Sequence, residues 1–151
     1  MKLRIHNHRN AKDIISRDLL TSLVDTLERI SINYKYDRPP YIRESILNVL
    51  FTIGWSDKVR IDPARGITVT SMCKGVALAL QTGNMARFYA DLLKLQTLYK
   101  TGKANAAIFL VFTKEAAKKL GSNLAHYERL VSELAIFKPT ITIPIAVIGI
   151  E

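Results

Sequence analysis

The sequence predicts an α/β fold in which a mixed five-stranded sheet is flanked by helices. Segments whose apolar residues recur at helical spacing alternate along the chain with short segments that have the spacing or composition of strands. Three short strands separated by tight turns fall near the middle of the chain, which predicts an antiparallel meander. A helix then leads from this meander into an apolar strand at 106–112. This order is typical of a mixed sheet with helices on both faces.

The first third of the chain is predicted to be helical. Apolar residues between Ile14 and Ile30 recur at helical spacing and predict one amphipathic helix. Pro39 and Pro40 interrupt the helix pattern, because proline lacks the backbone N–H that a helix interior needs. A second helix is predicted over 41–52, and Gly54 ends it.

The remaining elements alternate between strands and helices. Polar–apolar alternation and β-branched residues predict the three meander strands at 58–62, 67–72 and 76–81. Later helices are predicted at 85–100, with Asn84 as N-cap and Gly102 as stop, and at 114–137, with a break at 121–123. The last strand, 141–150, contains Pro144, which predicts a strand start or an edge position.

The length of 151 residues predicts a single domain, with an N-terminal arm and helix at 1–40 and a core at 41–151. Because His6, His8 and Arg9 are polar and have no third metal ligand nearby, we expect a flexible arm rather than a metal site. Cys73 is the only cysteine, which excludes an internal disulfide and a cysteine metal cluster. No apolar run approaches the ~20 residues of a membrane helix, so we expect a cytoplasmic protein.

The charge balance favours a polyanionic partner. Lys and Arg number 22 against 13 Asp and Glu, which gives a net charge of +9. Cations placed near phosphates release condensed counterions, which favours binding to nucleic acid. The alternative is a solvated surface whose charge serves solubility.

The strand predicted at 76–81 has two different faces, because side chains alternate across a sheet. One face carries Val76, Leu78 and Leu80, whereas the other carries Ala77, Ala79 and Gln81. The small face either packs closely under a helix or leaves room for a ligand.

The stretch 76–84 and the helix segment Arg87–Leu93 resemble the catalytic strand and helix of the BglII and BstYI restriction endonucleases. That family carries a variant of the PD-(D/E)XK motif in which Glu-x-Gln replaces Glu-x-Lys. Four further motifs are similar and occur in the same order, namely Tyr41–Glu44, Gly54–Trp55, Tyr127–Glu128 and Ile143–Ile150. The resemblance covers most of the chain from Tyr41 onward. It implies a restriction-endonuclease-like fold, double-stranded DNA as partner and a homodimer.

The resemblance also implies a nuclease site from which two acids are missing. In the family an Asp on the second meander strand and a Glu on the third hold Mg²⁺, which activates water for phosphodiester cleavage. Gln81 matches the Gln of the motif, whereas Ala79 stands at the Glu position and Thr70 at the Asp position. Glu44 and Asp62 are the nearest carboxylates that could replace the lost acids.

Three functions therefore remain open. The first is a DNA-binding protein with a degenerate nuclease site. The second is an active Mg²⁺-dependent DNA endonuclease, or an engineered inactive form in which Ala79 replaces a glutamate; Mg²⁺ is expected as cofactor only if cleavage is retained. The third is a protein-interaction domain that kept the fold alone.

Candidate phosphate contacts lie on the later helices. Basic side chains occur along the helix at 85–100 and its exit, and again after the strand at 106–112, namely Arg87, Lys94, Lys100, Lys103, Lys114 and Lys118. The alternative for Arg87 is an ion pair with Asp91 at i, i+4. The alternative for the lysines is an ordinary solvated face.

Overall fold

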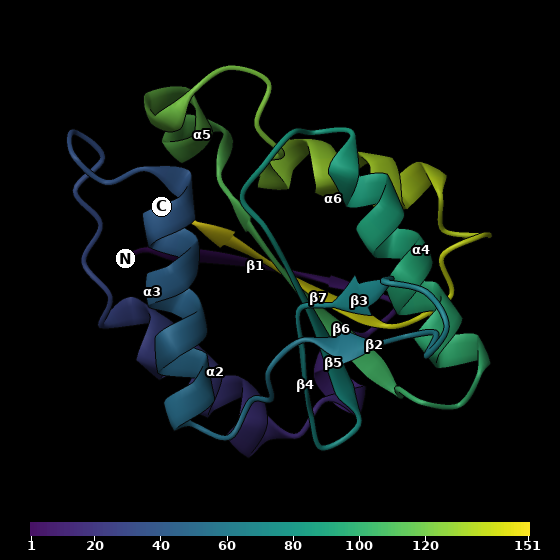
Figure 1. Ribbon diagram of the computed structural model, residues 1–151. Helices are drawn as coiled ribbons and strands as arrows, with labels where there is room; N and C mark the ends of the chain where they lie inside the picture. The colour runs from purple at the N-terminus through teal and green to yellow at the C-terminus, as the bar shows by residue number, and fades with distance from the viewer.

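The computed structural model describes residues 1–151 and contains seven strands and six helices (Figure 1). The strands are β1 (Leu3–His8), β2 (Val59–Arg60), β3 (Thr68–Val69), β4 (Ser71–Cys73), β5 (Val76–Gln81), β6 (Ala106–Phe112) and β7 (Ile145–Ile150). The helices are α1 (Ala11–Ile14), α2 (Arg17–Glu28), α3 (Pro39–Thr52), α4 (Arg87–Lys100), α5 (Lys114–Leu120) and α6 (Tyr127–Ile136).

The predicted fold class is confirmed: five strands form one mixed sheet in the order β1-β7-β6-β5-β4. The central pairs β5–β6 and β6–β7 are parallel, and the outer pairs β1–β7 and β4–β5 are antiparallel. Every residue of β5, β6 and β7 is buried, as expected for strands that are covered on both faces.

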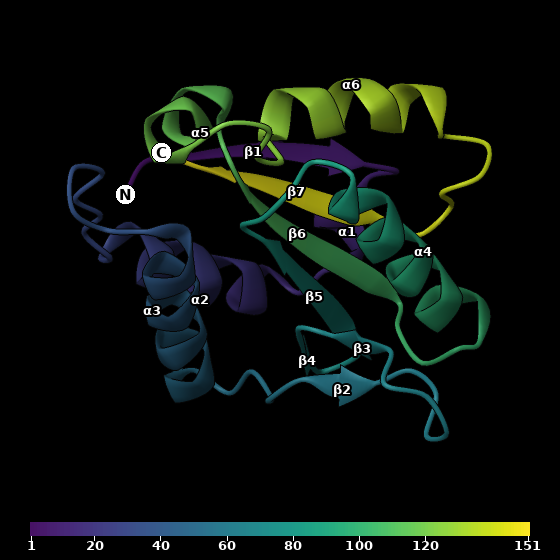
Figure 2. The same ribbon diagram turned by 45° about the horizontal axis from the view of Figure 1, so that its top comes forward.

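Helices cover both faces of this sheet, and each face has its own apolar core (Figure 2). Val76, Leu78 and Leu80 of β5 pack with the core residues of α2 and α3. Ala77 and Ala79 pack on the other face with Phe88 and other core residues of α4 and with α6. The face assignment made from strand alternation is therefore confirmed, and the small side chains lie under a helix.

The prediction for the N-terminal segment is wrong. Residues 3–8 are not a flexible arm, because β1 pairs along its whole length with β7. His8 is buried, and its Nε2 lies 2.7 Å from the carbonyl oxygen of Ile141; burial lowers the pKa of this imidazole. An edge strand keeps one edge in solvent and so tolerates polar residues, which is why its composition suggested an arm.

The single helix predicted after Asn10 is divided in two. Ile15 is extended between α1 and α2. The Ser16 side chain accepts a hydrogen bond from Leu19 N at 3.4 Å and caps α2. A serine at this position supplies the acceptor that the first turn needs, so the helix begins again there.

The predicted three-stranded meander is only partly correct. The strand predicted at 67–72 changes partner at Thr70: Val69 pairs with Val59 in a separate two-stranded sheet, while Ser71 pairs with Leu78 in the main sheet. Thr70 therefore occupies the corner between the two sheets. The main sheet still has five strands, because β1 takes the place of β2.

Other boundaries follow local chemistry. Gly54 and Gly102, with φ of 94° and 72°, follow the ends of α3 and α4 in a conformation that suits glycine. Pro144 directly precedes β7, which lies between β1 and β6, so the strand-start prediction is correct and the edge prediction is wrong. The helices are too short or too polar for any of them to span a membrane.

Candidate nucleic-acid interface

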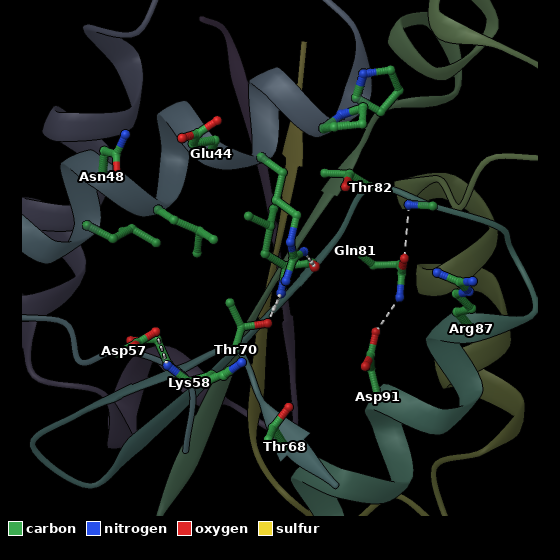
Figure 3. A pocket seen from close by; sticks show the side chains of 18 of the residues that line it. Glu44, Asn48, Asp57, Lys58, Thr68, Thr70, Gln81, Thr82, Arg87 and Asp91 are labelled. Carbon is green, nitrogen blue, oxygen red and sulfur yellow. Dashed lines mark hydrogen bonds between the residues drawn. The ribbon is translucent and has the colours of Figure 1, made fainter. Parts of the chain in front are cut away.

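A cleft of about 1020 Å³ lies between α3 and α4 (Figure 3). The end of β5 and the corner around Thr70 also line it, so the change of partner at Thr70 shapes its base. Both signs of charge are present among the lining side chains, namely Arg43, Glu44, Asp57, Lys58, Arg87, Asp91 and Lys94.

Gln81 lines the cleft as the last residue of β5, and both ends of its amide are bonded within the protein. Its Nε2 donates to Asp91 Oδ2 of α4 at 2.5 Å, and its Oε1 accepts from Gly83 N at 2.9 Å. Lys94 Nζ lies 3.4 Å from Asp91 Oδ1. Figure 3 shows Gln81 and Asp91 pointing toward each other. The Gln81 side chain thus ties the end of β5 to α4.

Burial and the neighbouring polar groups act in opposite directions on the pKa of Asp91. Burial raises the pKa of this carboxyl, although the Gln81 hydrogen bond and the neighbouring Lys94 and Arg43 act in the opposite direction. The Arg87–Asp91 ion pair considered from the sequence is not formed, and Asp91 pairs instead with Lys94, one turn farther along α4.

Both backbone polar groups of Leu80 are bonded to side chains. Its N–H donates to Thr70 Oγ1 at 3.1 Å. Its carbonyl oxygen accepts from the guanidinium of Arg43, which reaches across from α3. Burial lowers the pKa of Arg43, and the charge of Asp91 partly offsets that effect. Arg43 is therefore a half-buried cation beside the position where the resemblance expects an acid.

The two acid positions carry no carboxylate in the structure. Thr70 presents its hydroxyl to the Leu80 backbone. Ala79 lies two residues before Gln81 on the same face, is 2% exposed, and packs in the apolar core beneath α4. The side chains at these positions supply one hydroxyl and one methyl group, neither of which balances the charge of a divalent cation.

The carboxylates proposed as replacements do not assemble a metal site. Glu44 lines the cleft on α3, whereas Asp62 lies outside it, in the turn after β2, where it pairs with Arg65 at 2.5 Å. Asp57 lines the cleft and caps the backbone N–H of Lys58 at 2.7 Å. No three His, Cys, Asp or Glu side chains are grouped so that they could hold a metal ion. The residues present do not fit Mg²⁺.

The structure brings some of the expected phosphate-binding cations together and separates others. Arg87 and Lys94 line the cleft. The other four candidates are exposed outside it, at the end of α4, in the following turn and on α5, namely Lys100, Lys103, Lys114 and Lys118.

Three charged residues that line the cleft were not identified from the sequence. One lies on α3 and two directly precede β2, namely Arg43, Asp57 and Lys58. Arg43 lies within the Tyr41–Glu44 motif, but nothing in the sequence distinguished it from an ordinary exposed cation on α3. No signal distinguished Lys58, since its position depends on how β2 sits beside α3.

The chain is similar to known proteins in sequence and in fold. The family model described as "Restriction endonuclease BglII/BglIII" matches residues 3–150. The crystal structure of restriction endonuclease BglII complexed with a DNA 16-mer superposes with a TM-score of 0.86 at 16% sequence identity, covering 100% of this chain and 79% of that one. Free BglII gives a TM-score of 0.80 at 16% identity, with 100% and 80% covered. No curated protein sequence matches this chain. Because the family model spans nearly the whole sequence, the chain belongs to the BglII/BglIII restriction endonuclease family.

Proposed function

We propose that this protein binds duplex DNA in the cleft between α3 and α4 without cleaving it by a metal-dependent mechanism. Membership of the family supports DNA as the ligand, and one similar BglII structure contains a DNA 16-mer. The observation that carries the proposal is that Thr70 in the cleft and Ala79 in the core beneath α4 stand at the two acid positions, while the cleft contains several cations.

Two cations of the cleft are available to phosphates without any rearrangement. The side chains of Lys58 and Arg87 line it and make no hydrogen bond or ion pair within the protein. Arg43 makes only its bond to the Leu80 carbonyl. Lys94 is the least available, because it is paired with Asp91. Lys58, Arg87 and Arg43 therefore allow up to three phosphate contacts in the cleft.

Three contacts set the expected salt dependence. Each neutralised phosphate lowers the slope of log K against log salt concentration by ~0.9, so three contacts predict a slope of about −2.7. Between 50 and 200 mM salt the affinity should then fall roughly 40-fold. The measurement is fluorescence anisotropy of a labelled 16-base-pair duplex in EDTA. A wild-type protein that fails to bind at 50 mM salt would falsify the proposal and would direct attention to a protein partner.

Cleavage is tested separately with supercoiled plasmid in Mg²⁺ or Mn²⁺. We expect no nicking by the wild-type protein, because no group of carboxylates is available to hold the ion. The control is Glu44→Ala, matched by Asp62→Ala outside the cleft. Nicking that disappears only in Glu44→Ala would establish an active metal-dependent nuclease and refute the non-cleaving function. Nicking that survives both variants, and also survives substitution of Asp57 and Asp91, the other carboxylates of the cleft, would indicate a contaminating nuclease.

A further inference from the structure

The guanidinium of Arg43 is a half-buried charged group in the cleft that is only partly satisfied within the protein. An arginine has five N–H donors, and within the protein Arg43 uses one of them, on the Leu80 carbonyl oxygen. Its other nitrogens are not among the fully buried polar atoms that lack a partner. Because Arg43 lines the cleft, the remaining donors face the space that a ligand would occupy.

The surroundings of Arg43 match the place where the family resemblance puts the metal. Thr70, at the Asp position, accepts a hydrogen bond from the N–H of Leu80, and Arg43 donates to the carbonyl oxygen of the same residue. Gln81, the matching residue of the Glu-x-Gln motif, directly follows Leu80. Asp91 is bonded to Gln81, and its negative charge favours the protonated form of Arg43 by raising the pKa of the guanidinium. A permanent organic cation thus lines the cleft and is bonded to Leu80, the residue that directly follows Ala79.

We propose that Arg43 is a resident cation that takes over the phosphate-binding role of a divalent metal, so that a phosphodiester of bound DNA docks on its guanidinium. This inference rests on the proposed function, because it needs DNA in the cleft. A planar guanidinium offers two parallel N–H donors to a phosphate and keeps its charge at every physiological pH. An acid at position 70 would pair with Arg43 rather than with a metal ion.

The arrangement also gives a partly buried cation a role that offsets the cost of its burial. Removing a guanidinium from water carries a free-energy cost, and one hydrogen bond to a neutral carbonyl offsets little of it. Asp91 supplies some opposing charge but is shared with Lys94. A bound phosphate would accept hydrogen bonds from the open donors and would neutralise the positive charge of Arg43.

The test compares Arg43→Gln and Arg43→Lys with the wild-type protein by anisotropy on a 16-base-pair duplex in EDTA. Arg43→Gln should weaken binding about 10- to 100-fold, as expected for loss of a charge-assisted hydrogen bond. It should also reduce the magnitude of the salt slope by ~0.9. Arg43→Lys should restore the slope but not the full affinity, because a lysine lacks the two-pronged geometry. The matched control is Arg17→Gln, an exposed position on α2 outside the cleft, which should bind like the wild type.

A metal titration completes the test. At constant ionic strength, replacing EDTA by Mg²⁺ should not tighten binding by the wild type, since the cation that binds the phosphate is already present. A wild-type affinity that rises tenfold or more with Mg²⁺ overturns the proposal. If the wild type binds DNA but Arg43→Gln shows the same affinity and slope, the role of Arg43 is refuted while the proposed function stands. If the wild type does not bind at all, both are refuted.

A spectroscopic measurement covers the case in which Arg43→Gln does not fold. The Nε–Hε signal of Arg43, assigned by its absence in Arg43→Lys, should shift when duplex is added to ¹⁵N-labelled wild-type protein. An unchanged signal under saturating DNA overturns the proposal without any substitution at this position.

Discussion

The contact between Gly149 and Tyr127 allows a stability prediction whose size follows from the structure. A Cβ placed on Gly149 would lie 2.8 Å from Tyr127 Cγ, 2.9 Å from its Cδ2 and 3.0 Å from its Cβ. These atoms lie at the base of the side chain, and their position is fixed by the backbone because Tyr127 is the first residue of α6. The ring cannot yield by turning its far end away, so either α6 or β7 must shift.

The expected cost comes from overpacking. Carbon atoms prefer separations of about 3.5–4.0 Å, so Gly149→Ala demands a displacement on the order of 1 Å. Insertion of a methyl group into a well-packed site reduces the free energy of unfolding by about 1–3 kcal/mol. For a chain of this length each kcal/mol lowers the midpoint of thermal unfolding by about 2–4 °C.

A double-mutant cycle isolates the contact. Urea denaturation is measured for the wild type, Gly149→Ala, Tyr127→Ala and the double variant. Tyr127→Ala removes Cγ and Cδ2 but keeps Cβ, which would lie 3.0 Å from the new methyl group, so Gly149→Ala should cost less in this background than in the wild type. A loss that is the same in both backgrounds would refute the steric reasoning, because the effect would then not depend on Tyr127.

Two further predictions concern the cleft. Thr70→Asp with Ala79→Glu should fail to bind Mg²⁺ by isothermal titration calorimetry, because the new carboxylates pair with Arg43, whereas adding Arg43→Gln should produce measurable binding; equal affinity in both variants contradicts this. Burial raises the pKa of Asp91 in the folded protein, so its ionised form opposes folding above that pKa and the opposition is relieved as pH falls through it. As pH falls from 7 to 4, the unfolding free energy of the wild type should therefore rise relative to that of Asp91→Asn, as measured by urea denaturation at each pH. A difference between the two proteins that does not change with pH would exclude this role for the carboxyl group.

Several elements could be predicted from the sequence because their causes are local. The alternation along β5 assigned Leu78 to one core and Ala79 to the other, since the side-chain period of a strand is a property of the backbone. The helix ending before Gly102 was predictable for a similar reason, as the chain needs a residue that accepts positive φ there. Gln81 was singled out as a candidate site residue because it matches the Gln of the Glu-x-Gln motif in the family that this stretch resembles.

Other features depend on pairings between distant segments. Residues 3–8 have the composition of an arm, and only hydrogen bonds to β7, more than 130 residues later, make them a strand. Thr70 became a corner because Val69 and Ser71 pair with different sheets.

The sequence by itself determined the order and type of most elements, the excess of positive charge and the absence of acids at positions 70 and 79. Only the tertiary structure decided that Arg43 of α3 reaches the end of β5, that Asp91 is held by Gln81 and Lys94, and that Asp62 lies outside the cleft. The physical reason is that composition and periodicity act over a few residues. The neighbours of a charged side chain, in contrast, are set by the packing of whole elements against one another.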